Sequence, residues 1–322
     1  MVKCKTNDIY VPESAEFVIE GYVDPTEDLV LEGPFGDHTG YYSLADYYPK
    51  FHVTCITHKK EAVYPATIVG KPPMEDCYMA KATERIFLPI LKMQIPELVD
   101  INLPLEGVFH NCAIVSVENH YPGCAQKVMN SIWGMGQMMY TKMIVVVDSS
   151  VDVQNLKEVA KAVQSNVRGR QHLVISKGPL DALDHSSNEA MFGSRLGIIA
   201  TEQHTEKKES TYKIIAIEKT QPFQGQEAIQ KAFEEGEDRF VIVVEKPTDT
   251  KDLSTVMWKM FNNIDASRDL MVEGEKIGFD ATKKWREEGL TRPWPNEIEM
   301  SEDMKEQVSR RWNEYGISTD RK

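Results

Sequence analysis

The chain has 322 residues, of which 41% are hydrophobic and 27% charged, enough to bury a core in two domains or one large one. Lysine and arginine total 37 against 50 aspartates and glutamates, and the net charge of −13 disfavours binding to nucleic acid or anionic lipid. The longest aliphatic run, Met143 to Val147, is too short for a transmembrane helix, and the first residues contain no apolar secretory signal. Five cysteines without a CxxC pair indicate free thiols in a reducing compartment, so we expect a cytoplasmic protein.

The first third of the chain is predicted to be mostly strands, because β-branched and aromatic runs alternate with glycine, proline and aspartate. One helix is expected in this part, over residues 78–87, and Pro89 predicts its end because the residue before a proline disfavours helical geometry. The predicted strands are 16–20, 51–56, 62–69 and 109–117.

From Gly123 onward the pattern changes to strands that alternate with helices. Apolar residues spaced by three and four predict a helix over 123–140, and the polar stretch 202–211 predicts an exposed linker. The alternation indicates a parallel sheet with right-handed crossovers. The other predicted elements are strands 143–147 and 173–176, a helix over 155–164, and a surface helix over 301–316 that Trp312 could dock.

An internal repeat supports this reading. A shift of 97 residues places the hydrophobic strand 143–148 over 240–245, and at a shorter offset 193–201 resembles 274–282. The matches keep their order along the chain, which predicts a duplicated strand–helix–strand unit. Two copies are too few for a solenoid.

The most unusual segment is Glu-Gly-Pro-Phe-Gly-Asp-His-Thr-Gly at residues 32–40, which we call the motif loop. Glu32 and Asp37 are five residues apart, and only a folded loop can turn both side chains toward one cavity. Paired carboxylates repel each other, which raises one pKa and gives a proton donor beside a fixed anion. Composition alone favours the simpler interpretation, a surface turn with two solvated acids.

Two other groups of residues suggest chemistry. His110, Cys112, His120 and Cys124 offer four zinc ligands within a short stretch, although their spacing is also that of a strand with incidental histidine and cysteine. Lys142 directly precedes a buried strand, where it could hold an anionic ligand or simply be solvated.

The motif loop, extended to Tyr42, resembles the UbiD family of decarboxylases, which use prenylated FMN. The resemblance covers nearly the whole chain, in family order, and it favours a functional loop over a surface turn. The further segments that carry it are 64–76, Phe87-Leu-Pro, Tyr121-Pro-Gly, 140–148 and 278–285.

The resemblance implies non-oxidative decarboxylation of an aromatic or α,β-unsaturated acid, with a hydroxybenzoate-like quinone precursor as the expected substrate. By position, Asp37 matches the family's proton donor, Glu32 the acid that pairs with an arginine, and Lys142 a lysine that reaches the flavin phosphate. The family's complete site also uses a divalent metal, with potassium as a further candidate ion. We assign no metal ligand in this chain, because the arginine, the metal ligands and most flavin contacts are expected upstream of its first residues.

The fold class expected from the resemblance is α/β. Residues 1–118 would form the C-terminal part of a flavin-binding split β-barrel, and 119–322 an α/β oligomerisation domain with an inserted second copy at about 205–275. Expected partners are a small aromatic acid, a second copy of the chain in a homodimer or larger homo-oligomer, and the family's N-terminal half as a separate chain. We expect this chain alone to have little activity. The alternative interpretation is a non-catalytic assembly module.

Overall fold

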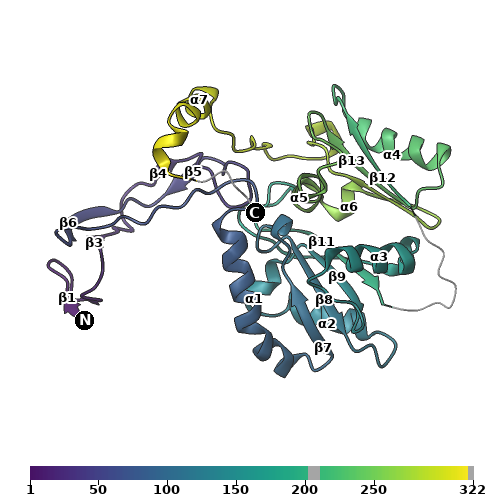
Figure 1. Ribbon diagram of the computed structural model, residues 1–322, viewed down its shortest axis with the longest axis horizontal. Coiled ribbons are helices and arrows are strands. Elements are labelled where there is room, and N and C mark those ends of the chain that lie inside the picture. Colours follow the sequence, from purple (N-terminus) through teal and green to yellow (C-terminus); the bar gives the residue numbers. More distant parts are fainter. Residues whose placement is uncertain (202–210, 318–322) are drawn as a thin grey trace.

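The computed structural model describes residues 1–201 and 211–317; the predicted linker thus lies almost wholly outside the described residues. An extended β-rich arm, residues 1–72, projects from a body built on two sheets (Figure 1). The arm contains three antiparallel two-stranded ribbons. These pair β1 (Val2–Lys3) with β2 (Tyr10–Val11), β3 (Phe17–Tyr22) with β6 (His52–His58), and β4 (Val30–Glu32) with β5 (Asp46–Tyr48).

Two predictions in this part of the chain are wrong. Residues 62–69 form no strand, because nothing pairs with them and Pro65 cannot donate to a ladder. Helix α1 (Glu75–Gln94) continues through Pro89, because a proline removes only its own N–H while Leu91 and the cap residue Ile95 still bury their side chains against the sheet.

The first sheet has the order β10–β11–β9–β8–β7. Its three central strands, β8, β9 and β11, are parallel, which confirms the predicted parallel sheet, and antiparallel strands form its edges. The domain boundary predicted at 118/119 falls between β8 and β9, which pair directly. The elements are β7 (Leu98–Asn102), β8 (Cys112–Val117), α2 (Cys124–Trp133), β9 (Met143–Asp148), α3 (Leu156–Asn166), β10 (Leu173–Pro179) and β11 (Phe192–Ala200).

The second sheet repeats this topology, which confirms the duplication and extends it. Its order β12–β13–β15–β14 corresponds to β8–β9–β11–β10, with the same three parallel strands and the same antiparallel edge. Each unit thus contains four equivalent strands, whereas the predicted unit was a strand, a helix and a strand. The elements are β12 (Tyr212–Ile217), α4 (Gln224–Glu235), β13 (Phe240–Glu245), α5 (Leu253–Asn263), α6 (Ala266–Asp269), β14 (Leu270–Glu273) and β15 (Lys276–Asp280).

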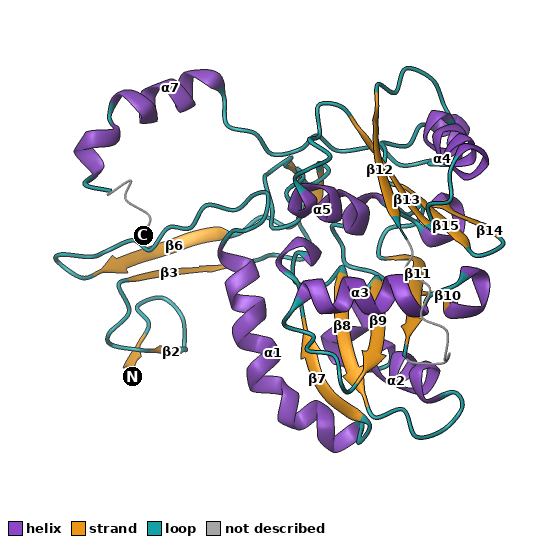
Figure 2. Cartoon of the chain, turned by 45° about the vertical axis from the view of Figure 1, so that its right-hand side comes forward, coloured by secondary structure: helices purple, strands orange, loops and turns teal. Residues whose placement is uncertain are grey.

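The two sheets share one hydrophobic core. Side chains from β8, β9 and β11 meet those of β12, β13 and β15, with α3 and α5 between the sheets (Figure 2). Helices α1 and α2 cover the other face of the first sheet, and α4 covers the other face of the second. The second unit therefore packs against the first, and α5 lies at the junction of the two.

The last described residues lie outside this core. Helix α7 (Glu302–Arg310) has no buried residue, and Trp312 contacts Tyr315 edge-on while 39% of its surface stays exposed. The prediction that Trp312 docks this helix is therefore wrong. Among the helices of the described residues, none combines the length and the apolar character needed to cross a bilayer.

Candidate functional site

The motif loop leaves the arm and docks on α5 of the second unit. Gly40 adopts φ +83°, and a Cβ at this position would lie 2.7 Å from the Trp258 ring, so only glycine permits this approach. The Trp258 indole donates a hydrogen bond to the Thr39 carbonyl at 2.8 Å. Tyr41 is 2% exposed, stacks on Trp258, and donates its hydroxyl hydrogen to Asn263 at 2.9 Å. These contacts fix the end of the loop that follows Asp37.

A second segment pairs with the same loop from the other side. Tyr41 and Glu297 form an antiparallel bridge, and the amides of Tyr42 and Ile298 donate to carbonyls of Asn296 and Gly40 at 2.9 Å each. Glu297 also forms ion pairs with Lys71 and Lys259, with N···O distances of 2.6 and 2.7 Å. The loop is thus held between α5 and residues 296–298.

The two predicted acids have different surroundings. Asp37 is partly buried and accepts hydrogen bonds from its neighbour His38, through the backbone amide at 2.7 Å and the ring Nδ1 at 3.1 Å. Glu32 ends strand β4 opposite Asp46, and its side chain is exposed. Within the described residues, neither a hydrogen bond nor an ion pair joins the two acids, and no arginine contacts Glu32. The loop places both acids on one segment, and Asp37 is the better fixed of the two.

Lys142 is buried within the protein. Its ammonium donates to Asp184 Oδ2 at 2.7 Å, Ser186 Oγ at 2.7 Å and the Asn262 carbonyl at 2.8 Å, which uses all three of its protons. The nearby ammonium holds the pKa of the Asp184 carboxyl below its usual range, even though burial acts in the opposite direction.

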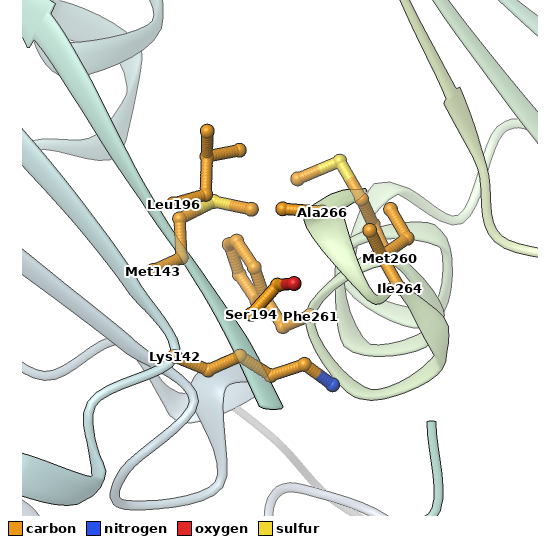
Figure 3. Close-up of a pocket in the computed structure, with 8 residues that line it drawn as sticks. All are labelled: Lys142, Met143, Ser194, Leu196, Met260, Phe261, Ile264 and Ala266. Carbon is orange, nitrogen blue, oxygen red and sulfur yellow. The ribbon is translucent and has the colours of Figure 1, made fainter. Parts of the chain in front are cut away.

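A small apolar cavity lies beside Lys142. Its volume of about 10 Å³ has room for one water molecule at most. Figure 3 shows the lysine extending along the edge of this cavity, below Ser194, while Met143 and Leu196 line the opposite side. A flavin phosphate could reach Lys142 only by displacing one of its internal acceptors.

The predicted zinc set does not form. Cys112 is fully buried in β8, and burial strongly raises the pKa of its thiol, which keeps the thiol protonated. His120 is exposed and contacts Glu118, and Cys124 donates to the Glu118 carbonyl. Of the four residues, only His110 belongs to a group with metal-ligand geometry in the described part of the chain. His110 lies in the turn before β8, Cys112 lies within β8, His120 lies in the loop that follows, and Cys124 begins α2. The four candidates therefore belong to different elements.

Several residues around the loop were not predicted. His38, Asp181 and Asp184 surround His110, and His185 packs its ring on Tyr41 at a centroid distance of 4.3 Å. For His38, its position beside Asp37 in the motif was the available signal. Asp181 and Asp184 lie in the irregular segment between β10 and β11, where sequence periodicity gives no indication.

Buried His185 predicts a pH dependence of stability. Burial lowers its pKa to about 4, against about 6.5 when unfolded, while Asp184 acts in the opposite direction and Lys142 in the same one. The unfolded chain then binds more protons between these values, so stability should fall as the pH drops from 6.5 toward 4, by roughly 3 kcal/mol from this residue. Urea unfolding at several pH values should show a flatter profile for His185→Gln, whereas exposed His120→Gln should keep the wild-type profile. Equal slopes of stability against pH in the wild type and in both variants would contradict the assignment of this pH dependence to His185.

Comparison with known families agrees with this architecture. Residues 1–72 match the Rift-related domain of 3-octaprenyl-4-hydroxybenzoate carboxy-lyase, and residues 77–200 and 208–282 match the C-terminal domain of the same enzyme. Both matches are to domains of one protein family, which is described by its carboxy-lyase member. The chain belongs to the UbiD family. The second match includes most of the segment predicted as an inserted copy, so the family domain itself contains the second unit.

Relatives and solved structures extend the match. Proteins of uncharacterised function from Archaeoglobus fulgidus and Aquifex aeolicus are 39% and 38% identical over 98% of this chain, and 48% and 49% of their own lengths are covered. The chain therefore spans about half the length of the curated relatives it matches. Vanillic acid decarboxylase of Sedimentibacter hydroxybenzoicus, in its open form, has a TM-score of 0.58 at 28% identity over 72% of this chain and 49% of that one. HmfF of Pelotomaculum thermopropionicum, a UbiD-class enzyme in complex with FMN, has a TM-score of 0.52 at 30% identity over 62% and 44%.

Proposed function

We propose that this chain provides the acid-bearing part of a prenylated-FMN-dependent decarboxylase. The proposed substrate is an aromatic or α,β-unsaturated acid, with hydroxybenzoate-like quinone precursors as the first class to test. The observation that carries the proposal is the motif loop, in which Asp37 is fixed next to His38 on a loop docked against α5. The family membership and the vanillic acid decarboxylase neighbour support the choice of reaction.

The residues of this chain supply the proton chemistry. Loss of carbon dioxide leaves negative charge on a carbon atom, and a proton must take the place of the carboxyl group. Asp37, protonated, donates that proton and is left as a carboxylate, which the His38 amide and ring stabilise by donating to Oδ1. Prenylated FMN, when bound, would supply the electron sink for the electron pair that carbon dioxide leaves on the substrate carbon.

Glu32 and Lys142 have different proposed roles. Glu32 is exposed, so its carboxylate is available to pair with an arginine from outside this chain, and we propose that it orients that group. Lys142 already has three acceptors, so we propose that it holds the structure together and that other groups bind the flavin phosphate.

A second candidate function follows from the arm. Its ribbons expose apolar side chains, among them Ile19, Val53 and Ile56 of the β3–β6 pair, with 57%, 53% and 57% of their surfaces accessible. Such a surface is typical of one that another polypeptide covers. Under this alternative the chain is a non-catalytic assembly module, which folds and associates without binding flavin.

One experiment separates the two functions. The chain is purified from a host that makes prenylated FMN, analysed by native mass spectrometry, and assayed with a panel of hydroxybenzoates. One flavin per chain with release of carbon dioxide supports the decarboxylase. A flavin-free species that gains flavin and activity when the family's N-terminal half is added also supports it, with the arm as the interface. A chain that stays flavin-free and inactive in that complex contradicts the proposal and favours the assembly module.

A further inference from the structure

Three potential metal ligands from distant parts of the chain converge beside the motif loop. His38 belongs to the loop, His110 precedes strand β8, and Asp181 follows strand β10. One ligand atom from each residue lies within 4.8 Å of the other two. Neither the repeat nor the proton chemistry of Asp37 requires these residues, which are at least 71 positions apart in the sequence, to meet.

The distances suit a single ion. The two Nε2 atoms of His38 and His110 face each other at 2.8 Å, with their ring planes at 78°. Two nitrogens bound about 2.1 Å from one ion lie about 3.0 Å apart at a right angle and about 3.4 Å apart at the tetrahedral angle, so the two rings must turn and separate by less than about 1 Å to admit it. Asp181 Oδ1 lies 3.7 Å from His110 Nε2, close enough for a small rotation of its side chain to complete the set.

The surroundings of His38 are those of a metal-bound imidazole. Histidines that bind a metal through one nitrogen commonly donate the other N–H to a carboxylate, which fixes the ring orientation. His38 Nδ1 faces Asp37 Oδ1 at 3.1 Å in this way. His110 is 8% exposed and its Nδ1 has no partner among the described residues, so packing and the contacts of its Nε2 with His38 and Asp181 orient its ring.

We propose that His38, His110 and Asp181 bind a divalent transition-metal ion, with two imidazoles and one carboxylate as ligands and the remaining positions open to water. Imidazole favours zinc, cobalt, nickel or iron(II) over magnesium and calcium. The ion joins the motif loop to the first sheet and thereby fixes the residue next to Asp37. The proposal concerns binding by this chain itself and does not depend on the decarboxylase activity.

Titration calorimetry with zinc and visible absorption spectroscopy with cobalt test the site on this chain after treatment with a chelator. We expect one tightly bound zinc per chain, a cobalt ligand-field spectrum, and a higher melting temperature with zinc. His38→Gln and His110→Gln should each abolish stoichiometric binding. Asp37→Asn keeps all three ligands but weakens the support of His38, so it should reduce affinity by about 10–100-fold.

His120→Gln is the matched control, because His120 is 69% exposed and lies outside the cluster. Its zinc affinity should equal that of the wild type. His38 is in a loop whose docking rests on other residues, so His38→Gln should keep the wild-type circular dichroism spectrum. Equal affinity for zinc in the wild type and in folded His38→Gln would overturn the proposal, as would an absence of stoichiometric binding in the wild type.

Discussion

Replacing Asp184 by alanine should lower the free energy of unfolding by about 3–5 kcal/mol, because a buried ion pair that loses one partner leaves the other charge uncompensated. The side chains of Lys142 and Asp184 are only 5% and 2% exposed, and their charged atoms lie 2.7 Å apart. Water cannot replace the lost carboxylate, and the adjacent cavity of about 10 Å³ is too small to admit a hydration shell. Urea unfolding followed by circular dichroism measures the effect.

Two controls distinguish the cost of a buried, uncompensated charge from the loss of an ion pair as such. The double variant Lys142→Met with Asp184→Leu removes both charges at similar volume, so it should recover most of the stability lost in Asp184→Ala. The exposed pair Arg310 and Glu306 is a matched surface case, and Arg310→Met should leave the unfolding midpoint nearly unchanged. If Asp184→Ala proved as stable as the wild type, Lys142 would not need its internal partner and would be available for a phosphate.

The role of Lys142 could not be predicted from the sequence alone. Its place before a buried strand was correct, but its partners are 42 and 120 residues away along the chain. No local pattern indicates that Asn262, in the second unit, turns its carbonyl toward the first sheet. An internal salt bridge and an anion-binding lysine have the same sequence signature until the tertiary structure is known.

The duplicated body could be predicted in more detail than the arm. Residues 143–147 and 240–244 of these strands are all hydrophobic because helices cover both faces of their sheets, and such runs remain recognisable as a repeat in the sequence. The helices α2 and α4 also correspond, but their sequences differ, so the repeat in the sequence missed them. The strand predicted at 62–69 was wrong because propensity cannot show that a pairing partner is missing.

The second unit also has a structural consequence that the sequence did not show. Trp258 of α5 contacts the motif loop directly and Asn263 contacts Tyr41 just after it, so the duplicate holds the loop that carries both acids. The prediction of Glu32 and Asp37 as site residues came from the family resemblance of the motif loop, since composition alone favoured a surface turn. Their support comes from a helix more than 200 residues later, which only the fold brings near.

Replacing Asp37 by asparagine should reduce the decarboxylation rate of the assembled enzyme by about 10²–10⁴-fold, the range typical of a lost general acid. Asparagine has nearly the same shape and can still accept the hydrogen bond from the His38 ring, so the loop should keep its position. Because the change removes the transferable proton, kcat should fall while KM stays near the wild-type value. Steady-state release of carbon dioxide measures both quantities.

Asp46→Asn is the control for this prediction, because Asp46 is an exposed carboxylate opposite Glu32 in the β4–β5 ribbon and outside the motif loop. It should keep wild-type turnover. Glu32→Gln should also lower kcat, since Glu32 is proposed to orient an arginine at the site, but it leaves the proton donor in place and should cost less than Asp37→Asn. A wild-type kcat for Asp37→Asn would exclude Asp37 as the donor. The docked loop would then serve to hold the substrate or the cofactor, with the proton supplied by another group.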